Sequence, residues 1–199
     1  MALEKQILND AMQTFAIEAE SLAETAKVLE PDAFARAVEA LAKAPRIAAA
    51  GCGHTGIACR HFAHLMCCIE RPARFLSPAE AVHGGMGFLQ SGDVMLLASR
   101  GGKTDELMPI ADICRRKGVT VIAVTENLSS PLAEKADIVL AMKVTRECDP
   151  YNCQGTTSFA VTCAIFDALQ VAVLEATGFR NEEFAIIHPH GAVGKRLNG

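Results

Sequence analysis

Residues 46–56 read RIAAAGCGHTG, a short apolar run that ends in a glycine-rich turn. The apolar run is typical of a strand buried on both faces, and the apolar spacing of residues 55–69 after it predicts a helix. Further strands are predicted at 73–76, 94–98, 119–124 and 137–142, and helices at 104–116 and 129–135. Because parallel neighbours need long crossover connections, this order predicts an α/β fold, a doubly wound three-layer sandwich around a five-stranded parallel sheet.

Two helical segments flank this predicted core. In residues 3–29 apolar side chains recur at intervals of four, seven or eight, which predicts a long N-terminal helix with one apolar stripe: Leu3, Ile7, Phe15, Leu22 and Leu29. The stripe has no obvious place on the sheet, so we expect either a subunit contact or packing within the chain. Residues 155–175 are apolar nearly all round, so we expect this helix to be buried by more than one neighbour. The interpretation is one domain, 1–199, with N-terminal helices in 1–43 and a core in 44–199.

Composition excludes several classes of function. The chain has 199 residues, half of them hydrophobic, and a net charge of −4 with both signs interspersed, so we expect no nucleic acid partner. The apolar strand runs are far shorter than the roughly 20 residues that span a bilayer, so we expect no membrane partner. The first residues lack the basic and then apolar stretch of a signal peptide, which favours a cytoplasmic protein.

The eight cysteines include no Cys-x-x-Cys pair. Several lie in apolar segments, where a reduced cysteine behaves as a small hydrophobic residue. We therefore expect no metal and a reducing compartment.

The turn at 51–56 matches the pattern Gly-x-Gly-x-x-Gly, and it includes Gly53 and Thr55. Glycines allow a tight turn at a helix N-terminus, where free N–H groups and the helix dipole favour an anion. A dinucleotide site also needs an acidic residue near the end of the second strand. That strand ends in Phe-Leu-Ser-Pro and the first acid is Glu80, so we expect no dinucleotide cofactor.

A second glycine-containing turn follows the third strand, with Ser99, Gly101 and Thr104 among its residues. Ligands of doubly wound sheets bind beyond the carboxyl ends of the strands, where both turns lie. A third group of hydroxyls, Thr156, Thr157 and Ser158, opens the apolar helix, either as an N-cap or as part of the same anion site.

At these residues the sequence resembles the sugar isomerase (SIS) domain family, and within it the arabinose 5-phosphate isomerase branch. The resemblance runs from about residue 46 to 197. It includes EAVHG at 80–84, KVTREC at 143–148, DAL at 167–169 and FAIIHPHGAVG at 184–194. Many members continue into a paired CBS regulatory region, which has no counterpart in these motifs.

The resemblance implies a flavodoxin-like SIS fold, no cofactor, and a homo-oligomer, most commonly a tetramer. It implies that phosphate is bound by Thr55, Ser99, Thr104 and residues 156–158, and that catalytic or substrate-contacting roles fall to Glu106, Glu147, His83 and His188. Three positions depart from the family. His54 stands where lysine is usual at a position implicated in catalysis, residues 99–103 replace Ser-Asn-Ser-Gly-Glu, and His190 replaces glycine.

These residues favour an aldose–ketose isomerase of a phosphorylated sugar, with arabinose 5-phosphate and ribulose 5-phosphate as the best-supported pair. Such a reaction moves a proton between adjacent carbons through a cis-enediol and needs a base. Glu147 is the candidate carbon base, and His188 is the candidate for opening the sugar ring. Two alternatives stay open: a 6-phospho-3-hexuloisomerase, and a non-catalytic phosphosugar sensor.

Overall fold

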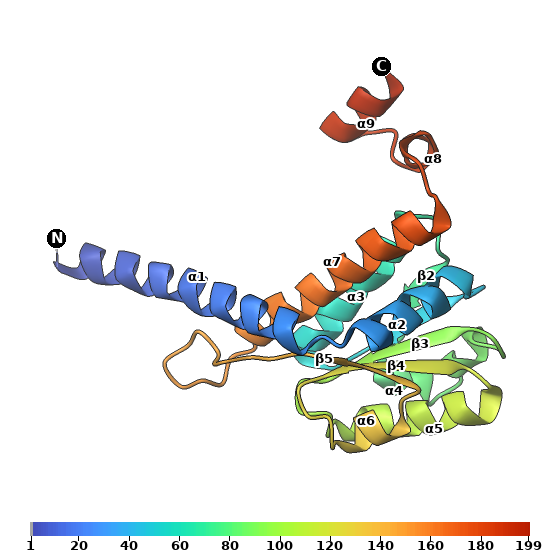
Figure 1. The fold of residues 1–199 in the computed structure, drawn as a ribbon, viewed down its shortest axis with the longest axis horizontal. Coiled ribbons are helices and arrows are strands. Elements are labelled where there is room, and N and C mark those ends of the chain that lie inside the picture. Colours follow the sequence, from blue (N-terminus) through green and yellow to red (C-terminus); the bar gives the residue numbers. More distant parts are fainter. Residues whose placement is uncertain (1) are drawn as a thin grey trace.

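A computed structural model describes the backbone of residues 2–199 and the side chains from Leu3 onward; Met1 lies outside the described residues. Five parallel strands form one sheet in the order β2-β1-β3-β4-β5 (Figure 1). The strands are β1 (Ile47–Ala50), β2 (Ala73–Phe75), β3 (Val94–Ala98), β4 (Thr120–Thr125) and β5 (Ile138–Ala141). The predicted α/β class and five-stranded parallel sheet are confirmed, and strand bounds differ from the predicted ones by one residue or less.

Helices cover both faces of the sheet because successive side chains of a strand point to opposite sides. Ile47 and Ala49 face the core formed with α2 (Pro31–Lys43), α3 (Gly53–Cys67) and α7 (Thr157–Thr177). Ala48 and Ala50 face α5 (Met108–Lys117) and α6 (Pro131–Lys135). The short helices α4 (Pro78–Ala81), η1 (Gly85–Phe88) and η2 (Asp105–Leu107) belong to the connections. The predicted three layers are therefore present.

The central strands are buried on both faces, whereas β2 is only partly buried. We expected burial of all five strands. The prediction was wrong for β2 because this strand lies at the edge of the sheet and pairs only with β1.

Helix α7 packs between three other helices, as its all-round apolar sequence predicts. It contacts α1 (Ala2–Val28), α2 and α3, and Phe166 stacks on Phe62 of α3 with ring centroids 4.9 Å apart. Such an aromatic pair contributes about 0.5–1.5 kcal/mol beyond its buried area. Among the described residues, α7 is the one helix long and apolar enough to cross a membrane, with a mean hydropathy of 1.7.

Helix α1 extends away from the body of the molecule (Figure 1). Its first half exposes large apolar side chains: Leu3, Ile7, Leu8, Met12 and Phe15. Its second half is attached to the segment after β5. The Thr25 hydroxyl donates to the Lys143 carbonyl at 2.9 Å, and the Ser21 hydroxyl accepts from the Thr145 N–H at 3.1 Å.

Two short helices, α8 (Asn181–Ile187) and α9 (Gly191–Asn198), follow α7 and stand at its C-terminal end, away from the sheet (Figure 1). The C-terminal end of α7 is opposite the end that begins near the carboxyl edge of the sheet. The segment 180–199 therefore lies far from the loops that follow β1 and β3.

Candidate functional site

The turn after β3 contains a hydroxyl pair. Ser99 Oγ and Thr104 Oγ1 lie 2.8 Å apart, and the Gly102 N–H donates to Ser99 Oγ at 3.1 Å. Thr104 stands at the N-cap of η2 but its side chain does not cap that helix. The two hydroxyls are thus held together by the turn itself, at the position where a doubly wound sheet binds ligands.

In the turn after β1, which leads into α3, Gly51 and Gly56 pack against the turn itself and Gly53 supplies a positive φ. Gly53 has a φ of 55°. A β-carbon on Gly56 would lie 2.6 Å from the Gly51 carbonyl oxygen, which no side chain tolerates. His54 and Thr55 therefore occupy the first turn of α3, where unpaired N–H groups are directed at the carboxyl edge.

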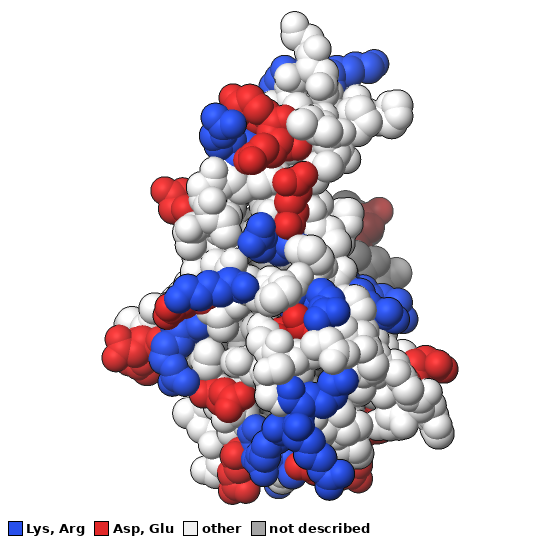
Figure 2. Space-filling model, turned by 90° about the vertical axis from the view of Figure 1, so that its right-hand side faces the viewer, with Lys and Arg blue, Asp and Glu red and all other residues white. Residues whose placement is uncertain are grey.

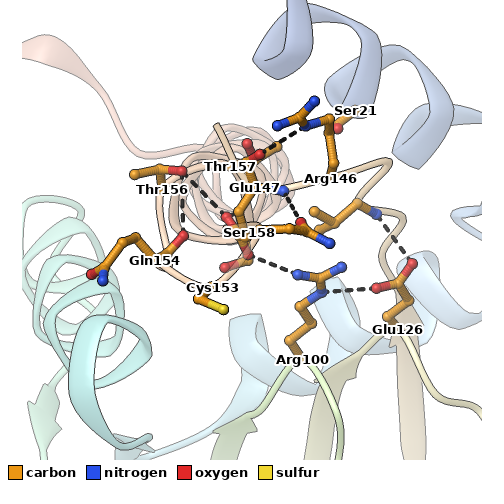
Figure 3. A network of polar contacts seen from close by, with 12 residues as sticks. Ser21, Arg100, Glu126, Arg146, Glu147, Cys153, Gln154, Thr156, Thr157 and Ser158 are labelled. Atoms are coloured by element: carbon orange, nitrogen blue, oxygen red, sulfur yellow. Dashed lines mark hydrogen bonds and ion pairs between the residues drawn. The ribbon is translucent and has the colours of Figure 1, made fainter. Parts of the chain in front are cut away.

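Glu147 lies at the centre of the third group of polar residues (Figure 3). It is 3% exposed although it is an acid. Its Oε2 accepts from the Ser158 N–H at 3.1 Å and from the Thr156 hydroxyl at 3.4 Å, and its Oε1 accepts from Arg100 Nη1 at 2.8 Å. A buried carboxylate is held in place by such donors because its desolvation is otherwise costly.

The predicted hydroxyl group at 156–158 divides into three different environments. Thr156 is the N-cap residue of α7 without a capping bond, and its hydroxyl lies between Glu147 and the Gln154 carbonyl, at 3.4 Å from each. Thr157 is fully buried, and its Oγ1 lies 3.1 Å from Cys148 Sγ. Ser158 contributes its backbone N–H to Glu147.

The loop that carries Glu147 is fixed by two side chains that sequence reasoning did not single out. Asn152 Oδ1 accepts from the Glu147 N–H at 2.7 Å. Asp149 accepts from the N–H groups of Tyr151, Cys153 and Gln154 at 2.9, 2.9 and 2.8 Å. Desolvation raises the pKa of Asp149, but these backbone hydrogen bonds lower it more, so the net pKa is below its usual value. Asp and Asn in a polar loop commonly bond to nearby backbone in this way, so composition alone gives only a general signal.

In the sequence Arg100 stands out only as part of the 99–103 departure from the family pattern, and in the structure it pairs with two carboxylates. Its Nη1 binds Glu147, and its Nε donates to Glu126 Oε2 at 2.9 Å (Figure 3). Glu126 in turn pairs with Lys143 Nζ at 3.1 Å. Burial raises the pKa of Glu126, but hydrogen bonds from Arg100, Lys143 and the Val144 N–H lower it more, so the net pKa is below its usual value. The signal in the sequence was Arg100 itself, in place of the asparagine of the family pattern.

His54 and Glu106 lie at the same edge of the sheet. A β-carbon on Gly155 would be 3.4 Å from His54 Nδ1, so this ring lies against the loop that follows Glu147. Glu106 lines a cavity of about 420 Å³ whose other walls include Gly51, Cys52, Gly53, Arg60 and Ser77. Burial and then the charge of Glu106 raise the pKa of the Cys52 thiol. A larger cavity of about 700 Å³, between α2 and α7, contains none of the predicted site residues.

Two predicted residues stand apart from this group. His83 is exposed on the turn after α4, a helix that contacts the η2 segment carrying Glu106. His188 is the C-cap of α8, with its ring 5.0 Å from that of Phe184, and it borders a small cavity with His64 and Cys67. Those two residues are in the last turn of α3, and a 15-residue helix is about 22 Å long. Within one chain His188 therefore does not join Glu147 and His54.

The charge on the surface is mixed. In the face shown in Figure 2, Lys and Arg side chains alternate with Asp and Glu over much of the surface, and one group of basic side chains gathers at the lower end. This distribution agrees with the interspersed charges and the net charge of −4 in the sequence.

Residues 40–172, which run from the end of α2 through the whole sheet into α7, match the SIS domain family. The chain belongs to the SIS domain family. An arabinose 5-phosphate isomerase, KdsD of Pseudomonas aeruginosa, is 36% identical over 198 residues, which cover 99% of this chain and 60% of that protein. The SIS chain thus spans about 60% of the length of this curated relative.

Solved structures agree with this membership. A Listeria monocytogenes protein described as a candidate sugar-phosphate isomerase is 40% identical, with a TM-score of 0.90 over 94% of this SIS chain and 98% of that one. An Escherichia coli CFT073 protein in complex with arabinose 5-phosphate is 25% identical, with a TM-score of 0.86 over 93% and 98% of the two chains. The predicted family resemblance is confirmed.

Proposed function

We propose that this SIS domain is an aldose–ketose isomerase that interconverts arabinose 5-phosphate and ribulose 5-phosphate. The observation that carries the proposal is Glu147, a carboxylate 3% exposed and bound by three donors at the carboxyl edge of the sheet. The isomerase name of the relative and the arabinose 5-phosphate bound by the structural neighbour point to the same chemistry.

The phosphate of the substrate is bound, in this proposal, between the turns after β1 and β3. The paired hydroxyls of Ser99 and Thr104 and the N–H groups near Gly101 supply donors on one side. Gly53 and Thr55, at the N-terminus of α3, supply donors and the positive end of the helix dipole on the other.

Glu147 then acts as the carbon base. It removes the proton from carbon 2 of the open-chain aldose, and the electron pair of that C–H bond forms the double bond of the cis-enediol while the oxygen on carbon 1 gains a proton. Glu147 then delivers to carbon 1 the proton that it took from carbon 2. The oxygen on carbon 2 loses its proton and becomes the ketone oxygen. His54 lies close enough to the Glu147 loop to hold the sugar oxygens whose charge changes in these steps. Glu106 completes the proposed substrate contacts at this edge. His83, exposed on the turn after α4 and apart from this group, stays a predicted substrate contact.

His188 enters this proposal as a residue of a second copy of the chain, because in its own chain it lies at the far end of α3. Self-association is supported by the exposed apolar side chains of α1, which need burial. We propose a homo-oligomer, in the form of a tetramer, with each site near a subunit boundary. A mass of 21.2 kDa by light scattering at micromolar concentration, the mass of one chain, would contradict it.

Two other functions are separated by experiment. A 6-phospho-3-hexuloisomerase would use the same groups on a hexose, and a sensor would bind a phosphosugar without converting it. The sensor gains support from His54, which replaces the family lysine. We also propose that residues 1–199 form a single domain. We further propose that the protein is cytoplasmic.

The test is incubation of the purified protein with a panel of aldose and ketose phosphates, followed by separation of the products. Conversion of arabinose 5-phosphate supports the proposal, and conversion only of a hexulose phosphate supports the second isomerase. Saturable binding without turnover supports the sensor. The melting temperature supplies a control, because a ligand at about one hundred times its Kd adds about 2.7 kcal/mol of stability. The phosphorylated sugar should raise the melting temperature, and free arabinose should not.

A further inference from the structure

The two oxygens of Glu147 are not equivalent. Among the described residues, Oε2 has two donors, the Ser158 N–H and the Thr156 hydroxyl, and Oε1 has one, Arg100. A carboxylate offers about four lone-pair sites, two on each oxygen. Oε2 is therefore approached by one donor, Ser158, and by a second, Thr156, that it shares with the Gln154 carbonyl, and the less occupied oxygen of Glu147 is Oε1, which Arg100 holds.

We propose that Arg100 is a positioning residue for the isomerisation, which turns Glu147 so that Oε1 is the oxygen that accepts the substrate proton. This inference rests on the proposed function of the site. Arg100 acts through Glu147 and is not assigned a contact with the sugar.

The guanidinium of Arg100 is fixed at both ends. Its Nε donates to Glu126 Oε2 at 2.9 Å while its Nη1 donates to Glu147 Oε1 at 2.8 Å. The planar, forked guanidinium suits two acceptors in fixed directions, which the single ammonium of lysine does not. Arg100 therefore transmits the position of Glu126 to the carboxylate of Glu147.

Glu126 is itself held from the opposite side. Its Oε1 pairs with Lys143 Nζ at 3.1 Å and accepts from the Val144 N–H at 3.3 Å. The backbone of Arg100 is fixed as well, since its carbonyl accepts from the Thr125 hydroxyl and from the Glu126 N–H, each at 3.0 Å. The chain Lys143–Glu126–Arg100–Glu147 thus alternates in charge and crosses from the segment after β5 to the start of α7. Figure 3 shows its part from Glu126 through Arg100 to Glu147.

Arg100 lies between the turn proposed to bind the phosphate and the proposed base, Glu147. It directly follows Ser99, whose hydroxyl pairs with Thr104 in the turn proposed to bind phosphate. The same turn that binds the phosphate therefore carries the side chain that orients the base. Loss of the guanidinium should affect the chemical step and leave the phosphate contacts in place.

The experiment compares kcat and KM for the wild type, Arg100→Gln, Arg100→Lys and Glu126→Gln. A base misplaced by about 1 Å costs about 10²-fold in rate, so Arg100→Gln should lower kcat about 10²-fold and change KM little. Arg100→Lys should retain part of the rate, because an ammonium can hold one carboxylate but not both. Guanidinium chloride, below the concentration that unfolds the protein, should restore part of the rate of Arg100→Gln. A structural role would not respond to it.

The matched control is Arg36→Gln. Arg36 is an exposed arginine of α2 whose Nη2 donates to the Asp137 carbonyl at 2.8 Å, before β5 and away from the carboxyl edge. It should have the kcat of the wild type.

The outcomes separate this inference from the proposed function. If the wild type converts a sugar phosphate and Arg100→Gln keeps its kcat, the positioning role is wrong and the isomerase stands. A loss of kcat without rescue by guanidinium, and without a partial rate in Arg100→Lys, also overturns it. If Arg100→Gln does not fold, Glu126→Gln decides, since it leaves Arg100 in place but releases it: an unchanged kcat refutes the role and a reduced one supports it. If the wild type converts no sugar phosphate, the proposed function fails first and the role falls with it.

Discussion

Gly102 packs its backbone directly against Ser130. A β-carbon on Gly102 would lie 2.0 Å from Ser130 Oγ and 2.4 Å from its Cβ, and Gly102 has a φ of +64°. Movement of the Ser130 hydroxyl would break the hydrogen bond that caps α6, because this hydroxyl accepts from the Ala133 N–H at 3.2 Å. This contact joins the turn after β3 to the start of α6.

We therefore expect Gly102→Ala to destabilise the protein by about 2–5 kcal/mol, the sum of overpacking and of strain in a left-handed backbone. Gly101→Ala is the control, since a β-carbon there meets nothing within 4 Å and its φ is not positive. It should change the free energy of unfolding by less than about 0.5 kcal/mol. Urea unfolding of both variants measures the difference, and equal stabilities would contradict the packing described for Gly102.

The fold could be predicted from the sequence because the patterns that indicate its strands and helices are local. Each buried strand is a short apolar run, and the helices between them carry their own apolar spacing. The residues at which the helices begin were harder to predict. Residues 104–107 were expected to begin a helix, but α5 begins at Met108 after the η2 turn, because the Thr104 hydroxyl pairs with Ser99 instead of capping. That choice depends on a tertiary contact.

The motifs of the candidate site are local as well. Motifs locate single residues such as Glu147, and the structure brings it beside Ser158 and near His54. The two ion pairs of Arg100 were not predicted, since its acceptors are 26 and 47 residues away in the chain and neither distance has a sequence signal. His188 lies at the end of α8, and its relation to the site in our proposal requires a second copy of the chain.

The pH dependence of stability should show the lowered pKa of Glu126. A carboxyl whose pKa is lower in the folded state stabilises the fold above its unfolded pKa, and this stability is lost as pH falls through the folded value. The unfolded value is near 4.5. Stability should thus fall more steeply below about pH 4.5 in the wild type than in Glu126→Gln, as followed by the urea midpoint at each pH.

Glu175→Gln provides the matched control for that measurement, because Glu175 is an exposed glutamate on α7. A slope in Glu126→Gln as steep as in this control would show that Glu126 does not contribute.

The cysteines should differ widely in reactivity. Burial raises the pKa of Cys114 to about 12, and burial and nearby thiols raise that of Cys59 further, whereas Cys67 and Cys153 are exposed. Because the thiolate is the nucleophile, about one Cys114 thiol in 10⁴ is reactive at pH 8. Iodoacetamide should therefore label Cys67 and Cys153 of the folded protein first, as peptide mass spectrometry will show. Early labelling of Cys114 would indicate that α5 opens easily.

Substrate should slow the reaction of Cys153 but not of Cys67, because Cys153 lies in the loop after Glu147.

The last prediction concerns His54, which lies against Gly155 and so beside the loop that carries Glu147. Lysine, usual in the family at this position, is a cation at neutral pH, whereas the imidazole of a histidine can both donate and accept a proton. If His54 handles a sugar oxygen in place of that lysine, His54→Ala should lower kcat about 10²-fold or more, the range for a group that transfers a proton. His54→Lys should keep much of the activity, and binding is measured against pH for both variants and for the wild type. The control is His61→Ala on the same helix, whose ring pairs with Asp167 at 3.1 Å outside the site and which should turn over substrate like the wild type. Binding must be compared with that of a phosphate-only ligand, because phosphate itself titrates near pH 6. Identical kcat values and pH profiles for wild type, His54→Lys and His54→Ala would exclude His54 from the reaction and leave Glu106 as the next residue to test.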